Sequence, residues 1–277
     1  MKLREGPTVH LPRRALLAGL ATAALGGRAM AQAPAQDDPW PSLAAQIFND
    51  HKLRDGSALL GIDLPYRAED AAVVPLTVRL TLPSDDKRHV RSLTCVIDQN
   101  PSPLAVTWSP GPGSGIRTIS TRVRIDSYTN VHVVAELSDG QRYVSQRFVK
   151  AAGGCSAPAA KQTAGAIPPG TIRFRQFAPA SGAASGLREA QLMIRHPNYS
   201  GMQMDQITRL YVPAHFIESV HLWQGDEPLL AIESGISISE NPEFRFDYRP
   251  NGASVFRAEA KDNEGKVFKD QWPVTPA

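Results

Sequence analysis

Cys155 is the residue whose neighbours point most directly to chemistry. It follows Gly153 and Gly154 in the stretch AAGGCSAPAAKQTAGAIPPG, residues 151–170, where Ile167 is the one large apolar residue. Such a stretch buries too little apolar area to offset the entropy lost on ordering, so we expect a mobile, solvated arm. A thiolate is both a nucleophile and a leaving group, which suits it to holding cargo covalently. The sequence therefore predicts that Cys155 is a covalent attachment site.

The residues around this cysteine fit an accessible arm. Gly153 and Gly154 are expected to give flexibility and to keep side chains away from a narrow entrance in a partner. Six residues separate Val149, the end of an expected strand, from Cys155, so the thiol could extend about 20 Å. Lys150 and Lys161 flank the arm, but an exposed position should make their effect on the thiolate small. The alternative is an incidental linker thiol.

The second cysteine, Cys95, calls for a different interpretation. Leu93, Cys95 and Ile97 share one face of an expected strand, and buried free cysteines behave as small hydrophobes. A Cys95–Cys155 disulfide is an alternative, although it would immobilise the arm. The pair does not form a C-x-x-C motif, which argues against thioredoxin-like redox chemistry.

No other pattern indicates a catalytic or metal site. Of the seven histidines, none has metal-ligand spacing to an acidic residue or a cysteine: His215 and His221 are six apart, and His196 precedes a proline. We expect structural or surface roles for them, and no metal. G-x-S-x-G, H-E-x-x-H, P-loop and dinucleotide-binding motifs are missing. The residues favour a carrier or binding module over an enzyme, with no catalytic residue and no cofactor.

The pattern of residues at the N-terminus indicates a targeting segment. Arg13 and Arg14 precede a modest apolar run, 15–27, and Ala29-Met30-Ala31 is a small-residue cleavage pattern. We therefore expect residues 1–31 to be a signal peptide cleaved after Ala31, with export to an oxidising compartment. The paired arginines suggest twin-arginine export, with the Sec route as the alternative. The run is too short for a membrane span.

Composition and periodicity predict an all-β protein. The net charge is +3 and the basic residues are scattered, which does not suggest nucleic-acid binding. Many prolines and glycines fit short strands joined by turns. An amphipathic helix is expected within residues 37–60, and a period-two pattern then predicts a first sandwich over residues 37–150. Its expected strands are 74–82, 92–98, 104–108, 121–125, 131–137 and 142–149.

A second strand-rich block follows the arm. Residues 171–277 are expected to form another sandwich, with a hairpin turn at Asp262-Asn263-Glu264-Gly265. The expected strands are 172–177, 191–195, 207–212, 219–223, 232–238, 243–248, 254–261 and 266–274. The fold class is thus two immunoglobulin-like sandwiches joined by a flexible, cysteine-bearing linker, residues 151–170.

Short motifs in both blocks resemble a known pair of sulfur-oxidation proteins. The first block resembles SoxY, through Ala68-Glu69-Asp70-Ala71-Ala72-Val73-Val74-Pro75, Asn100-Pro101-Ser102-Pro103 and Val149-Lys150-Ala151-Ala152-Gly153-Gly154-Cys155. The second resembles SoxZ, through Arg195-His196-Pro197, Val212-Pro213-Ala214-His215-Phe216-Ile217, Ser237-Ile238-Ser239-Glu240-Asn241-Pro242 and Asp262-Asn263-Glu264-Gly265. The order and coverage are those of a fused SoxYZ-like carrier, of the group associated with quinoprotein dehydrogenases.

The resemblance implies a periplasmic, non-catalytic protein. In the family, the cysteine that matches Cys155 holds sulfur intermediates of thiosulfate oxidation. A haem enzyme attaches the sulfur compound, a hydrolase releases sulfate, and a dehydrogenase oxidises remaining sulfane sulfur. Implied partners are these enzymes or a quinoprotein dehydrogenase. One alternative is an accessory protein that docks on such a dehydrogenase; another is a small-molecule-binding enzyme, which would need a polar pocket.

One departure from the family concerns the arm itself. The family arm ends the chain as Gly-Gly-Cys-Gly-Gly, whereas here Ser156-Ala157-Pro158 follow the cysteine and the chain continues. A free end can thread a narrow channel, but Cys155 would have to enter a partner as a loop. Pro158 also stiffens the exit.

Overall fold

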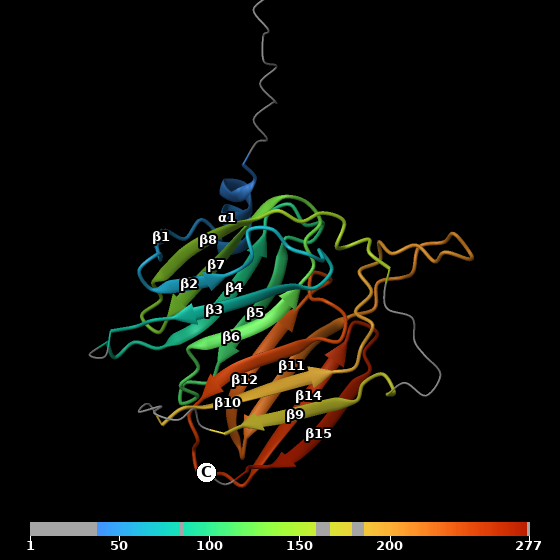
Figure 1. Cartoon of the computed structure of the whole chain (residues 1–277). Coiled ribbons are helices and arrows are strands. Elements are labelled where there is room, and N and C mark those ends of the chain that lie inside the picture. Colours follow the sequence, from blue (N-terminus) through green and yellow to red (C-terminus); the bar gives the residue numbers. More distant parts are fainter. Residues whose placement is uncertain (1–37, 84–85, 159–166, 179–185, 276–277) are drawn as a thin grey trace, which may run out of the picture. The chain divides into compact units, whose positions relative to one another are not determined.

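The computed structural model of the chain describes residues 38–83, 86–158, 167–178 and 186–275 (Figure 1). These residues contain fifteen strands and one helix, which confirms the expected all-β class. The expected signal peptide, residues 1–31, lies outside the described residues. Among the described residues, no helix is long and apolar enough to cross a membrane.

The helix α1 (Trp40–Phe48) is a short helix within the expected range, residues 37–60. Pro41 lies in its first turn, and Asn49 ends it in the left-handed region, with φ of 52°, a conformation typical of helix C-termini. Phe48 is buried against Val96 and Val134. The short helix expected within residues 37–60 is confirmed, and the strands begin after it.

The first half of the chain forms a two-layer sandwich. One layer follows the order β1-β8-β7-β4-β5, and the other follows β2-β3-β6. Alternating burial, as in β3, directs every second side chain into the core. The bounds are β1 (Leu53–Asp55), β2 (Leu60–Asp63), β3 (Val74–Leu80), β4 (Val90–Ile97), β5 (Leu104–Pro110), β6 (Thr118–Val123), β7 (Thr129–Leu137) and β8 (Arg142–Val149).

The second half repeats this two-layer plan. Its layers follow the orders β12-β11-β14-β15 and β13-β10-β9. The bounds are β9 (Ile172–Phe177), β10 (Arg188–Ile194), β11 (Ile217–Gln224), β12 (Glu227–Ser234), β13 (Glu243–Tyr248), β14 (Val255–Asp262) and β15 (Val267–Pro273). The strand expected at 207–212 is wrong: this stretch has only an isolated bridge, between Met204 and Tyr211.

Both layers continue from one half into the other, which the sequence did not predict. Strand β5 pairs antiparallel with β12, and β6 pairs antiparallel with β13, giving one nine-stranded and one six-stranded sheet (Figure 1). The buried side chains form a core cluster with members from both halves. Each half thereby covers strand edges that would otherwise be unpaired. The halves are joined by two strand pairings as well as by the linker.

Side chains reinforce the junction between the halves. Asn100 Nδ2 donates to Ser237 Oγ at 2.9 Å, and Asp247 Oδ1 accepts from the backbone N–H groups of Arg117 and Thr118 at 2.7 and 2.8 Å. Asn100 is 4% exposed. Buried polar groups that are satisfied in this way favour one relative placement of the two halves.

Candidate functional site

Cys155 lies in a turn shortly after β8, on the segment 151–158, which we term the Cys155 loop. Its exposed fraction is 0%, so the prediction of an exposed thiol is wrong for this structure. Residues 159–166 of the predicted arm lie outside the described residues.

Backbone hydrogen bonds hold the Cys155 loop against both halves of the protein. The N–H groups of Gly153 and Gly154 donate to the carbonyls of Asp126 and Ile125 at 2.8 and 2.9 Å. From the second half, Ser200 Oγ donates to the Cys155 carbonyl. The prediction of a solvated arm considered only the small size of the side chains. In the structure, hydrogen bonds of backbone groups and close packing hold this loop against the protein.

The structure explains why glycine occupies positions 153 and 154, and the reasons differ from the expected flexibility and access. Gly153 has φ of +78°, a conformation that favours glycine. A Cβ on Gly154 would lie 2.0 Å from the carbonyl oxygen of Ala71. Gly154 therefore permits a close approach of two backbone segments, and any larger residue would push the loop outward.

The surroundings of Cys155 keep its thiol protonated. Burial and, to a smaller extent, the nearby Asp126 carboxylate raise its pKa to about 12, although the Arg124 guanidinium acts in the opposite direction. Arg124 is 1% exposed, and its Nη1 donates to the Gly154 carbonyl at 3.1 Å. Since the thiolate is the reactive form, the docked cysteine is a poor nucleophile.

An apolar hairpin begins beside the Cys155 loop. Gln203 Oε1 accepts from the Ser200 N–H at 2.9 Å, and the Val212 N–H donates to the Gln203 carbonyl. Between Gln203 and Val212 the chain projects from the rest of the protein, as the orange segment in Figure 1 shows. Near its tip, Ile207, Leu210 and Tyr211 are 92, 69 and 66% exposed. Sequence reasoning took this apolar run for a strand and so missed a surface feature.

Cys95 behaves as predicted. Its exposed fraction is 0%, it lies in β4, and burial raises its pKa to about 12. Both cysteines are free, so the alternative of a Cys95–Cys155 disulfide is wrong for this structure.

Two of the histidines that the sequence left without ligand partners meet in the structure. His196 and His215 converge with Asp262, and the three ligand-type atoms lie within 4.8 Å of one another. His196 follows β10, His215 precedes β11, and Asp262 ends β14. No local spacing could reveal this group, because three separate segments supply it. His221 is exposed and stacks on Trp223.

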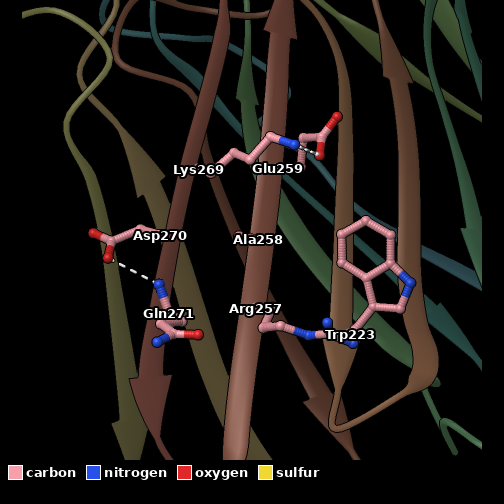
Figure 2. Close-up of a pocket in the computed structure, with 7 residues that line it drawn as sticks. All are labelled: Trp223, Arg257, Ala258, Glu259, Lys269, Asp270 and Gln271. Carbon is pink, nitrogen blue, oxygen red and sulfur yellow. Dashed lines mark hydrogen bonds and ion pairs between the residues drawn. The ribbon is translucent and has the colours of Figure 1, made fainter.

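A surface hollow of about 690 Å³ lies on the outer face of β11, β14 and β15 (Figure 2). Its charges are largely paired: Lys269 contacts Glu259 at 2.8 Å, and Arg257 contacts Asp226 at 2.9 Å. Trp223 supplies an aromatic wall. The residues that line it include neither a thiol nor a histidine.

Comparisons with known proteins identify both halves. Residues 44–155 match the sequence model of the sulfur oxidation protein SoxY, and residues 176–273 match that of the sulphur oxidation protein SoxZ. The chain thus combines two sulfur-oxidation carrier families. It has the architecture of a fused SoxYZ-like protein, with SoxY preceding SoxZ, and the resemblance of the first block to SoxY and of the second to SoxZ is confirmed. These two families indicate a carrier role in sulfur oxidation. A search of curated proteins found no match.

Solved structures offer weaker likenesses. SoxY from Chlorobium limicola f thiosulfatophilum is 24% identical, covers 40% of this chain and 94% of its own, and gives a TM-score of 0.32. The E23A superoxide reductase (neelaredoxin) from Ignicoccus hospitalis is 9% identical, covers 33% of this chain and 78% of its own, and gives 0.30. TM-scores this low support no argument about function.

Proposed function

We propose that this protein is a periplasmic, non-catalytic carrier that holds a sulfur intermediate covalently on Cys155. The observation that carries the proposal is the position of Cys155: it is the last residue of the SoxY match, on a loop held largely through backbone hydrogen bonds. A thiol on such a loop can be protected when docked and offered to a partner when released.

The chemistry at Cys155 follows from that of thiosulfate. Loading forms a disulfide bond: Cys–SH + S₂O₃²⁻ → Cys–S–S–SO₃⁻ + H⁺ + 2 e⁻, with a haem partner as electron acceptor. Hydrolysis by a second partner then gives Cys–S–S–SO₃⁻ + H₂O → Cys–S–S⁻ + SO₄²⁻ + 2 H⁺. The carrier contributes the thiol sulfur and the positioning, while the partners supply the redox and hydrolytic steps.

Release of the loop gives the thiol its reach. Lys150 remains anchored, because its N–H donates to the Tyr66 carbonyl at 2.7 Å. Five residues from Lys150 to Cys155 span at most about 17 Å. On the other side, Gly170 lies fifteen positions after Cys155, and its N–H donates to the Arg195 carbonyl. The shorter N-terminal side therefore sets how deeply the loop can enter a partner.

Arg124 gives the docked site a preference for anionic cargo. Its buried guanidinium lies close enough to Cys155 to lower the thiol pKa, and its Nε has no hydrogen-bond partner among the described residues. A sulfonate or persulfide on Cys155 would place negative charge near this cation, an interaction strengthened by burial. Burial also lowers the pKa of Arg124, and anionic cargo would offset that effect.

The apolar hairpin is the surface that we assign to partner recognition. Its exposed tip residues lie on a segment that begins beside Ser200, which binds the Cys155 carbonyl. Apolar and aromatic side chains of this kind dominate binding energy at interfaces. A partner that binds the hairpin would therefore contact the segment that holds the Cys155 loop.

Intact-mass measurement of protein purified from the periplasm tests the carrier role. We expect sulfur adducts on the wild-type chain and on Cys95→Ala, and none on Cys155→Ser. Adducts that persist in Cys155→Ser would refute the assignment. The same spectra test export, since cleavage after Ala31 gives a chain that begins at Gln32; replacing Arg13 and Arg14 by lysine should block twin-arginine export.

A second candidate is an accessory protein that docks on a periplasmic quinoprotein dehydrogenase. The exposed hairpin is the observation that favours it, because binding through a surface needs no thiol. In that case Cys155→Ser would retain full activity in cells, while polar replacements in the hairpin would abolish it. The carrier proposal expects both changes to abolish activity.

A further inference from the structure

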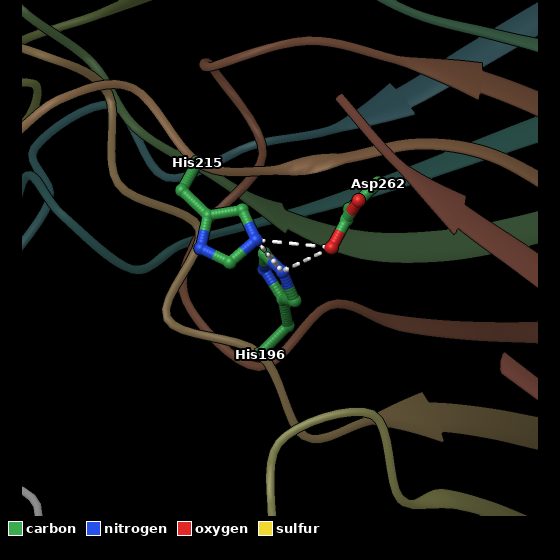
Figure 3. A group of neighbouring side chains, drawn as sticks. All are labelled: His196, His215 and Asp262. Carbon is green, nitrogen blue, oxygen red and sulfur yellow. Dashed lines mark hydrogen bonds and ion pairs between the residues drawn. The ribbon is translucent and has the colours of Figure 1, made fainter. Parts of the chain in front are cut away.

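We propose that His196, His215 and Asp262 form a binding site for a divalent transition-metal ion of the zinc type. Figure 3 shows both imidazole rings and the carboxylate directed toward one point. His196 Nε2 lies 3.3 Å from His215 Nε2 and 3.9 Å from Asp262 Oδ2, and His215 Nε2 lies 3.0 Å from Asp262 Oδ2.

These three distances fit one ion. A circle through three points with these separations has a radius of about 2.0 Å, so one point is equidistant from all three atoms at that distance. Zinc binds histidine nitrogen at about 2.0–2.1 Å and carboxylate oxygen at about 2.0–2.2 Å. The three ligand atoms are therefore already close enough together for a single ion to contact all of them.

Groups behind the ligands hold them in orientation. His196 Nδ1 lies 3.0 Å from Asn198 Oδ1 and 3.1 Å from the Asn198 backbone nitrogen, and Asn198 Oδ1 also accepts from the Ile217 N–H, so Asn198 fixes the orientation of the ring. Asp262 Oδ1 accepts from the N–H groups of Glu264 and Lys266 at 3.1 and 2.8 Å. Such outer contacts are typical of metal sites, since they fix ligand direction.

Burial and charge also fit a cation. Asp262 is 0% exposed and His196 is 1% exposed, and a buried carboxylate needs compensation. A divalent cation would supply that compensation.

The site has room for a fourth ligand. The His215 side chain is 27% exposed, and Glu264 Oε2 lies 3.6 Å from His215 Nε2. Glu264 or water can therefore supply the fourth ligand that zinc usually takes. Two nitrogen ligands with carboxylate oxygen suit zinc better than magnesium or calcium, which prefer all-oxygen ligands.

A bound ion would join three segments of the second half. The His196 segment continues to Ser200, which contacts the Cys155 carbonyl, while the His215 carbonyl accepts from the Tyr199 N–H. The ion would therefore act as a cross-link beneath the segment on which the Cys155 loop docks. This role does not depend on the identity of the cargo.

Zinc titration of the chelator-stripped full chain tests the site. Competition with a chromophoric chelator should give one tight site, and Co²⁺ should give the visible absorption of a four-coordinate ion. His215→Ala and Asp262→Asn should each weaken zinc binding at least about tenfold and abolish the zinc-dependent rise in Tm. His221→Ala, an exposed histidine outside the cluster, is the matched control and should retain both.

Two results would overturn the site. One is wild-type affinity for zinc no tighter than that of His215→Ala; the other is equal loss in His221→Ala, which would indicate nonspecific histidine binding. Asp262 is buried, so Asp262→Asn could fail to fold. The partly exposed His215→Ala, checked for a native circular dichroism spectrum without metal, then decides the question.

Discussion

The docked loop predicts that Cys155 reacts slowly in the native protein and rapidly once the loop is released. Releasing it requires only one change, Gly154→Ala, because the added Cβ would lie 2.0 Å from the Ala71 carbonyl oxygen, with the Ile125 oxygen at 2.7 Å. Both contacts are with backbone and cannot be relieved by a side-chain rotation. The loop must therefore move away.

The magnitude follows from the thiol pKa. Its shift from 9.0 to about 12 lowers the thiolate fraction at pH 8 from about 10⁻¹ to about 10⁻⁴, or roughly a thousandfold. Loss of access for the reagent lowers the rate further, while transient opening raises it. We therefore expect native Cys155 to be alkylated at least about a hundredfold more slowly than in the unfolded chain.

Iodoacetamide alkylation followed by intact mass and peptide mapping measures these rates. Gly154→Ala should bring the Cys155 rate to within about tenfold of the unfolded chain, while Cys95 in the same molecules stays protected. Gly113→Ala is the matched control, because a Cβ there meets nothing within 4 Å. With pH, the native rate should keep rising beyond pH 10 rather than level off near 9, since the docked thiol ionises at about 12.

Alkylation of native Cys155 about as fast as in the unfolded chain would refute the prediction of a protected thiol. A Gly154→Ala variant that folds normally and protects Cys155 as well as the wild-type chain does would refute it too. Either result would mean that burial and backbone contacts do not control access to this thiol.

Three further changes test other parts of the structure. Arg124→Met removes the donors to the Gly154 and Asn198 carbonyls, so Cys155 alkylation should accelerate; an unchanged rate would exclude this anchor. Asn100→Ala removes three buried hydrogen bonds around the junction and should lower the free energy of unfolding in urea by about 2–4 kcal/mol, whereas a loss under 0.5 kcal/mol would contradict it. Serine at the exposed Ile207, Leu210 and Tyr211 should leave Tm within about 2 °C of wild type and weaken partner binding; a large fall in Tm would show a structural role instead.

Much of the fold could be predicted from the sequence, because strand formation follows a local signal. Alternation in β3 placed Leu76, Val78 and Leu80 in the core, as the structure shows, and the position of Cys95 between Leu93 and Ile97 predicted its burial. The run at 207–212 misled the same reasoning, because its apolar residues project into solvent. Periodicity identifies an apolar face but does not show whether anything covers it.

By itself, the sequence determined the all-β class, the SoxY–SoxZ order and the choice of Cys155 over Cys95 as the candidate attachment site. Only the tertiary structure decided that Cys155 is buried, since its loop is held by Asp126, Ile125 and Ser200, residues far away along the chain. It also decided that β5 pairs with β12 and β6 with β13, and that His196, His215 and Asp262 converge. The physical reason is common to all three findings: composition and spacing describe what a segment can do alone, whereas its neighbours in space determine its backbone partners, solvent exposure and ligand geometry.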